Sequence, residues 1–194
     1  MAVVVISATG LGFYISLKQS QNQLEQNTAT QDLFWPNPKQ INDFNSKDHD
    51  NKDFGLKQMS GKWSFVFFGY TNCPDICPMT LNKMDIAISK LKKENKSLKL
   101  FFISVDPERD KPEVLKDYLD SFENNFVGIT GEPEEIYLLS QSWGILSQKI
   151  FNETGEYNVD HSSPVILLKD GKYVARISHK DDIKRSIKII KKYL

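Results

Sequence analysis

From residue 63 onward, short apolar runs alternate with amphipathic segments, and this alternation constrains the fold more than any other feature. The runs WSFVFFG at residues 63–69 and LKLFFISV at residues 98–105 are almost continuously apolar. Such runs are typical of strands that are buried on both faces, as in a parallel sheet. Between them, Leu81, Met84 and Ile88 recur at helical spacing, with lysines on the other side. A strand–helix–strand unit is therefore expected.

The rest of the chain continues this pattern. Pro112 and Pro133 each stand where a helix is expected to begin, and residues 126–129 between these helices predict a short strand. An Asp-Gly turn at residues 170–171 between two apolar runs predicts a hairpin, and a final helix follows it. This order predicts an α/β fold with a mixed sheet flanked by helices, in one domain over residues 34–194.

The N-terminal segment differs from the rest of the chain. Residues 1–17 carry no charge, and residues 18–33 are polar and rich in Gln, Asn and Thr. A helix over the first segment would span about 25 Å, which is workable for a ~30 Å hydrocarbon core if the bilayer thins. The segment lacks the basic start of a signal peptide. We therefore expect a transmembrane anchor and a tether; a cleaved signal peptide and a core helix are the alternatives.

The charge balance argues against a nucleic-acid partner. The chain has 25 Lys and Arg residues and 25 Asp and Glu residues, and hence no net charge. A protein that binds nucleic acid through the phosphate backbone is expected to carry an excess of basic residues.

The two cysteines, Cys73 and Cys77, come directly after the first apolar run. A disulfide between them would close too short a loop to stabilise the fold. We therefore interpret the two cysteines as a pair with a chemical role, either metal binding or disulfide exchange. We expect the next helix to begin at Pro78 with Cys77 as its cap, because proline inside a helix clashes with the preceding turn. A helix N-terminus favours the thiolate, which serves both metal binding and disulfide exchange. The spacing alone does not choose between them.

Copper(I) prefers soft thiolate ligands, and a third ligand would have to come from elsewhere in the chain. The chain has three histidines, and His49 and His179 lie in polar runs that predict exposed turns. His161 enters the first strand of the terminal hairpin, which in a thioredoxin-like sheet lies beside the strand that bears the cysteine loop. From position alone, His161 is as well explained by a structural role as by metal binding.

At this point the sequence resembles the Sco/SenC family of copper proteins. The matching segments are GKWSFVFFGYTNCPDICP at residues 61–78, SVDPERD at 104–110, VGITG at 127–131 and VDHS at 159–162. The resemblance implies a thioredoxin-like fold and a copper ion bound by Cys73, Cys77 and His161. It also implies a single-pass anchor in the inner, energy-coupling membrane, with the domain on the periplasmic or equivalent outer side.

The resemblance implies one of two functions. The first is a copper metallochaperone that delivers copper to the binuclear site of a respiratory oxidase, since three protein ligands leave a position open for an incoming ligand. The alternative is a thiol–disulfide oxidoreductase that keeps the acceptor's cysteines reduced, with Cys73 and Cys77 as its catalytic pair. Beyond that reductase chemistry no enzymatic activity is expected. A peroxide-reducing thioredoxin relative has only the fold to support it.

Five further residues lie near these motifs. Asp106 and Arg109 are expected to cap a loop and form an ion pair near the site, and Asp75 is expected to serve the turn after Pro74. Asp160 is a candidate for holding the His161 imidazole, although neighbouring side chains in a strand point apart. Pro164 departs from the family pattern, and its place is similar to that of the cis-proline of thiol oxidoreductases.

Overall fold

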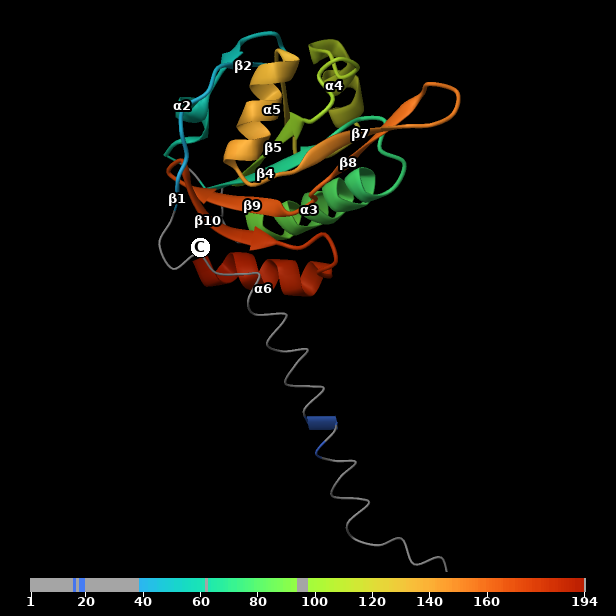
Figure 1. Ribbon diagram of the computed structural model, residues 1–194. Coiled ribbons are helices and arrows are strands. Elements are labelled where there is room, and N and C mark those ends of the chain that lie inside the picture. The colour runs from blue at the N-terminus through green and yellow to red at the C-terminus, as the bar shows by residue number, and fades with distance from the viewer. Residues whose placement is uncertain (1–15, 17, 20–38, 62, 94–97, 194) are drawn as a thin grey trace, which may run out of the picture. The chain divides into compact units, whose positions relative to one another are not determined.

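A mixed eight-stranded sheet organises the computed structural model, which describes residues 16, 18–19, 39–61, 63–93 and 98–193 (Figure 1). The strands lie in the order β1-β10-β9-β4-β5-β6-β2-β3. Their bounds are Lys39–Gln40 for β1, Ser46–Asp48 for β2, Asp53–Phe54 for β3, Trp63–Gly69 for β4, Leu98–Ser104 for β5, Val127–Thr130 for β6, Val165–Lys169 for β9 and Lys172–Ile177 for β10.

The helices cover both faces of this sheet. They are α2 (Leu56–Met59), α3 (Ile76–Lys92), α4 (Pro112–Leu119), α5 (Pro133–Ser142) and α6 (Ile183–Tyr193). Figure 1 shows α3 and α6 on one face and α4 and α5 on the other. This layered arrangement confirms the α/β class and the mixed sheet flanked by helices.

The central strand β4 sets the position of the cysteine loop. It pairs in parallel with β5 and antiparallel with β9, with Phe67 opposite Val165. Helix α3 connects the two parallel strands, so the expected strand–helix–strand unit is confirmed. Because the loop after β4 and the start of β9 lie at the same edge, segments far apart in the sequence meet there.

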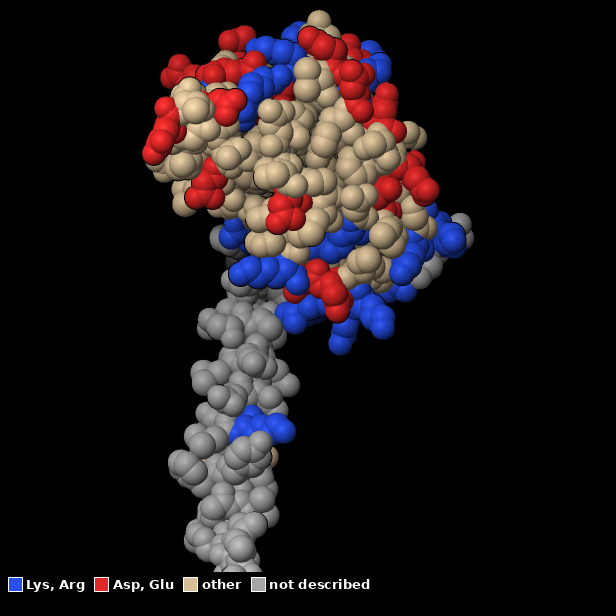
Figure 2. Space-filling model, turned by 90° about the vertical axis from the view of Figure 1, so that its right-hand side faces the viewer, with Lys and Arg blue, Asp and Glu red and all other residues tan. Residues whose placement is uncertain are grey.

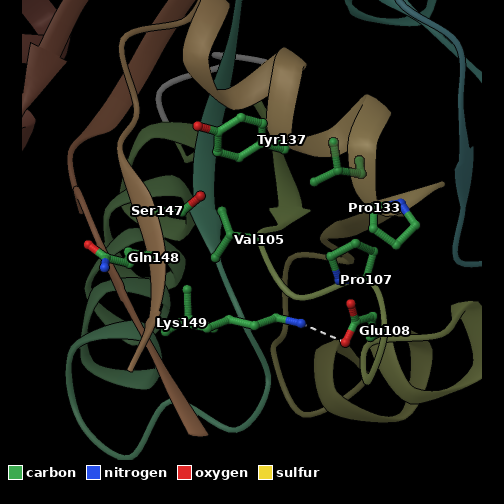
Figure 3. Close-up of a pocket in the computed structure, with 10 residues that line it drawn as sticks. Val105, Pro107, Glu108, Pro133, Tyr137, Ser147, Gln148 and Lys149 are labelled. Carbon is green, nitrogen blue, oxygen red and sulfur yellow. Dashed lines mark hydrogen bonds and ion pairs between the residues drawn. The ribbon is translucent and has the colours of Figure 1, made fainter. Parts of the chain in front are cut away.

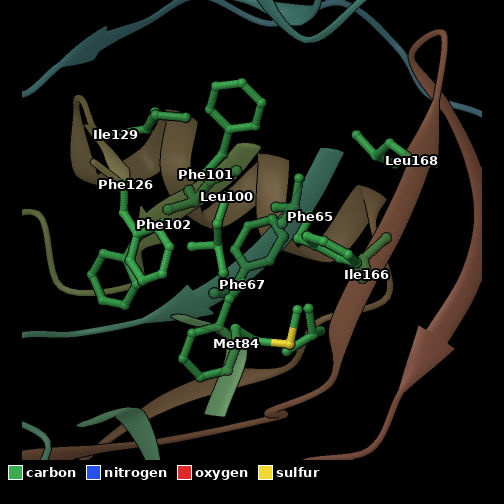
Figure 4. Close-up of a cluster of buried hydrophobic side chains, with 14 of the residues drawn as sticks. Phe65, Phe67, Met84, Leu100, Phe101, Phe102, Phe126, Ile129, Ile166 and Leu168 are labelled. Atoms are coloured by element: carbon green, nitrogen blue, oxygen red, sulfur yellow. The ribbon is translucent and has the colours of Figure 1, made fainter. Parts of the chain in front are cut away.

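The hydrophobic core lies where β4, β5 and α3 pack together (Figure 4). Phe65, Phe67 and Phe102 are fully buried, and so are Leu81 and Met84 of α3. Fully burying one such side chain contributes about 1.5–3 kcal/mol relative to its exposure. The helical periodicity read from the sequence therefore identifies the face of α3 that packs on the sheet.

The proline and glycine signals are also confirmed. Pro112 and Pro133 occupy the first turns of α4 and α5. Asp170 and Gly171 both have positive φ angles, 51° and 71°, and connect β9 to β10. The strand that was expected at residues 126–129 is β6, which begins and ends one residue later.

Several elements were not expected from the sequence. Strands β1, β2 and β3 and helix α2 precede β4, and a separate hairpin pairs β7 (Ser147–Phe151) with β8 (Tyr157–His161). The hairpin was missed because most of its side chains are exposed or only half-buried, so it lacks the apolar run of a core strand.

The chain divides between Phe34 and Trp35, and every strand described above lies in the second unit. The expected anchor at residues 1–17 and the expected tether at 18–33 lie almost entirely outside the described residues. Within the part that is described, no helix is long and apolar enough to cross a membrane.

Candidate metal centre

The loop that carries the cysteines starts at Gly69, the last residue of β4. A Cβ atom at this position would lie 2.7 Å from the Phe102 ring and 2.9 Å from the Cys77 sulfur. Both distances are shorter than real Cβ contacts, so a glycine is required for the Cys77 sulfur to pack against the end of β4.

Helix α3 begins at Ile76, two residues before the expected start at Pro78, so Cys77 lies in its first turn rather than at its cap. Pro78 is tolerated there because the first N–H groups of a helix have no partner within the helix. Asp75 occupies the N-cap position without a side-chain hydrogen bond, in agreement with its expected place in the turn.

The two cysteines differ in exposure. Cys77 is buried and Cys73 is half-buried, and the Cys77 main-chain N–H donates to the Cys73 sulfur at 3.4 Å. Burial raises the pKa of the Cys77 thiol well above its usual value. The helix N-terminus is expected to favour the thiolate, whereas burial acts in the opposite direction at Cys77.

His161 faces the cysteines from the end of β8, and not from the first strand of the terminal hairpin as expected. Its Nε2 lies 3.5 Å from Cys77 Sγ, and its Nδ1 lies 3.0 Å from the Ser162 carbonyl oxygen. Since a carbonyl oxygen only accepts hydrogen bonds, Nδ1 carries the proton and Nε2 presents its lone pair to the sulfurs. Ser162, and not Asp160, thus orients the imidazole.

Burial lowers the pKa of His161, which keeps the imidazole neutral and able to bind a metal ion. The ligand atoms of Cys73, Cys77 and His161 all lie within 4.8 Å of one another, and the described residues contain no other such group. His49 and His179 are therefore not part of this ligand group. Two sulfurs and one imidazole nitrogen suit a soft metal such as copper(I).

Asp106 and Arg109 form the expected ion pair, through Arg109 Nε and Asp106 Oδ2. Two aromatic residues that were not singled out from the sequence surround it. The Tyr157 hydroxyl donates to Asp106 Oδ1 at 2.8 Å, and the Tyr70 ring meets the His161 ring edge-on with centroids 5.8 Å apart. One sequence signal could have identified Tyr157. It is spaced by two residues from Val159 and by four from His161, and residues at this spacing lie on the same face of a strand.

A third carboxylate fixes the cysteine loop. Asp110 accepts hydrogen bonds from the Thr71 N–H at 3.0 Å, from the Thr71 hydroxyl at 2.6 Å and from the Ser104 hydroxyl at 2.6 Å. It therefore ties the end of β5 to the loop after β4. The bond before Pro164 is trans, as are all peptide bonds in the described residues, so the expected likeness to a cis-proline is not seen.

A pocket of about 480 Å³ beside His161 is lined in part by Tyr137 and Leu146, whose side chains are 51% and 66% exposed. A second pocket of about 330 Å³ lies further along β7, where Lys149 pairs with Glu108 at 2.6 Å (Figure 3). Figure 2 shows a broad uncharged area on this side of the domain, with acidic side chains above it and basic ones below.

The model of the SCO1/SenC family matches residues 36–194, which include all three ligands and both sheets. The chain belongs to the SCO1/SenC family. It is 41% identical over 121 residues to the mitochondrial SCO1 homolog 1 of Arabidopsis thaliana, a match that covers 61% of this chain and 36% of the plant protein.

Solved Sco structures share this fold. The structure of Arabidopsis thaliana ScoI with copper bound is 34% identical, with a TM-score of 0.73 over 79% of this chain and 99% of that one. BsSco, described as a member of the Sco family of cytochrome c oxidase assembly proteins with a disulfide switch, is 27% identical, with a TM-score of 0.65 over 82% and 95%. The fold is thus the mixed, thioredoxin-like α/β fold of Sco proteins.

Proposed function

We propose that the protein is a copper metallochaperone that binds one copper ion through Cys73, Cys77 and His161 and delivers it to the binuclear copper site of a respiratory oxidase. The observation that carries this proposal is the convergence of the three ligand atoms within 4.8 Å. The imidazole comes from a hairpin 84 positions away from Cys77. The unprotonated Nε2 faces the Cys77 sulfur, as a third ligand to a shared metal ion requires.

The ligand set suits a metal that must be handed on. Three protein ligands leave a position for a ligand from the acceptor, and a partner can approach over the pocket beside His161. Copper uptake displaces the proton of Cys77, whose pKa is raised by burial, while His161 is already neutral. The bound copper in Arabidopsis ScoI and the role named for the BsSco family support the choice of metal and of acceptor.

The proposed location is the inner, energy-coupling membrane, with residues 1–17 as a single-pass anchor and residues 18–33 as a tether. The domain would lie on the periplasmic or equivalent outer side. The absence of charge in the first segment and the polar composition of the second support this placement. The mitochondrial relative is in agreement with it.

A second candidate function is reduction of the acceptor's cysteines, which is favoured by the unequal exposure of the pair. The accessible Cys73 thiolate would attack the acceptor's disulfide and release one of its sulfurs as a thiolate. Cys77, once deprotonated, would then attack Cys73 and release the second. The products are a Cys73–Cys77 disulfide and a reduced acceptor, and the two electrons balance.

Titration of the reduced protein with copper(I) and with copper(II) tests the proposal. One equivalent of each should bind, and copper(II) should give a thiolate charge-transfer band. The Cys73→Ser variant is the control, because it lacks one sulfur and keeps the imidazole. Weak or non-stoichiometric binding by the parent protein would refute the metallochaperone and leave the reductase.

A further inference from the structure

Among the residues that the structure describes, the hairpin that carries His161 makes no backbone hydrogen bond to the main sheet. Within the described residues β7 pairs only with β8, as a separate two-stranded sheet. A metal ligand on such an element keeps its place only if side chains hold the element against the domain.

Arg109 makes several such contacts with β8. Its Nη1 donates to the Tyr157 carbonyl oxygen at 3.0 Å, and its guanidinium carbon lies 3.9 Å from the centre of the Tyr157 ring. Its Nε pairs with Asp106, a residue with no exposed surface, and Asp106 also accepts the Tyr157 hydroxyl at 2.8 Å. The main chain, the ring and the hydroxyl of Tyr157 are all held by one ion pair.

The Arg109 contact and His161 lie on the same face of β8. Tyr157, Val159 and His161 alternate with exposed residues, so all three side chains point toward the domain. Val159 is 5% exposed and belongs to the hydrophobic core. The rise of a strand places the Arg109 contact about 13 Å from His161, too far for a direct effect on the metal.

Tyr70 completes the connection. It is 3% exposed and lies between the two ends of the strand, with its ring 5.9 Å from the Arg109 guanidinium carbon and 5.8 Å from the His161 ring centroid. The second terminal nitrogen of Arg109, Nη2, is buried and has no hydrogen-bond partner among the described residues. Such a group costs free energy, so the planar stacking of the guanidinium has to compensate for it.

We infer that Arg109, paired with Asp106 and stacked on Tyr157, is a positioning residue for His161: it locks the β7–β8 hairpin so that the imidazole stays within reach of the cysteine sulfurs. This inference rests on the proposed copper site. Its effect should fall mainly on copper(II), which depends on the nitrogen ligand more than copper(I) does.

Three variants of the full-length protein in detergent test this role. Arg109→Ala removes every contact, and Arg109→Lys keeps the charge but loses the planar group that stacks on the ring. Tyr157→Phe removes only the hydroxyl bond to Asp106 and keeps the ring. The matched control is Arg185→Ala, which breaks another Arg–Asp ion pair, the one to Asp181.

We expect copper(II) affinity to fall at least tenfold in Arg109→Ala, several-fold in Arg109→Lys and least in Tyr157→Phe, with copper(I) affinity changed less than threefold. In the metal-free protein, the amides of β8 should exchange at least tenfold faster in Arg109→Ala, while those of β4 keep their protection. Arg185→Ala should match the parent protein in both measurements.

Copper(II) affinity within twofold of the parent in all three variants would overturn the inference. So would an equal loss of copper(I) and copper(II), or general loss of amide protection, because either would show a merely structural role. If Arg109→Ala fails to fold, Tyr157→Phe still tests the order of effects. Failure of the parent protein to bind copper(II) would refute the proposed function itself, which separates the two outcomes.

Discussion

The Nε2 atom of His161 lies 3.5 Å from the sulfur of Cys77, while Nδ1 is held by the carbonyl oxygen of the next residue, Ser162. The imidazole is therefore oriented in the correct tautomer before a metal ion arrives. Burial keeps it neutral. Each of these features serves a nitrogen ligand, and disulfide exchange by the cysteine pair needs none of them.

Replacing His161 by alanine separates the two proposed functions. Because copper(II) favours nitrogen donors, His161→Ala should lose copper(II) binding and its charge-transfer absorption, and bind copper(I) more weakly. The Cys73–Cys77 reduction potential should stay within a few tens of millivolts of the parent value, where ~30 mV corresponds to ~1.4 kcal/mol. If cells with this variant still assemble an active copper oxidase under limiting copper, metal delivery is not the essential task.

Removing either sulfur should abolish stable copper(I) binding. Cys73→Ser and Cys77→Ser each leave one thiolate and one imidazole, and the fold should persist because the pair closes no long loop. Anaerobic titration with a competing copper(I) chelator measures the loss, and circular dichroism checks the fold. One equivalent of tightly held copper(I) in either variant would contradict the ligand assignment.

The affinity for copper(I) should rise with pH. Because burial raises the pKa of Cys77, its thiol stays protonated in the metal-free protein at neutral pH, and copper must displace that proton. Each proton that copper displaces from a cysteine adds about a tenfold gain in affinity per pH unit, so at least a tenfold gain is expected. His161, with a lowered pKa, adds no further proton above its usual range. A copper(I) affinity that does not change between pH 6.5 and 8 would show that Cys77 is already ionised.

The glycine that ends β4 should be required for the geometry of the site. In Gly69→Ala the new methyl group would press on the Phe102 ring and on the Cys77 sulfur, so either the core or the ligand must shift. We expect a loss of about 1–3 kcal/mol in unfolding free energy, together with weaker copper binding. Gly131→Ala is the matched control, because its nearest neighbours lie at an ordinary 3.6 Å. Chemical denaturation of both variants provides the comparison, and equal stability would refute the packing argument.

The proposed anchor is tested by fractionation. A protein held by an uncharged segment at residues 1–17 should stay with the membranes after a high-salt wash and enter solution only with detergent. A variant without residues 1–30 should be soluble and folded. Release of the full-length protein by salt would show that the segment does not span the bilayer.

The sequence by itself determined the central part of the fold. Continuous apolar runs identified β4 and β5, because both faces of these strands are buried. The spacing of Leu81, Met84 and Ile88 identified the packed face of α3, and the cysteine pair marked the functional loop. These signals are local, because a buried strand or helix face can be recognised from apolar residues that are adjacent or regularly spaced in the sequence.

Only the tertiary structure decided how His161 reaches the cysteines. The hairpin that carries it is half-exposed and pairs with no other strand in the described residues, so its sequence has no strong periodicity. Its place depends on contacts that Arg109 and Tyr70, at least 48 positions earlier in the sequence, make with β8. The raised pKa of Cys77 could not be predicted from the local sequence either. The local sequence indicates only a helix N-terminus, whereas the burial that raises the pKa comes from residues distant in the sequence.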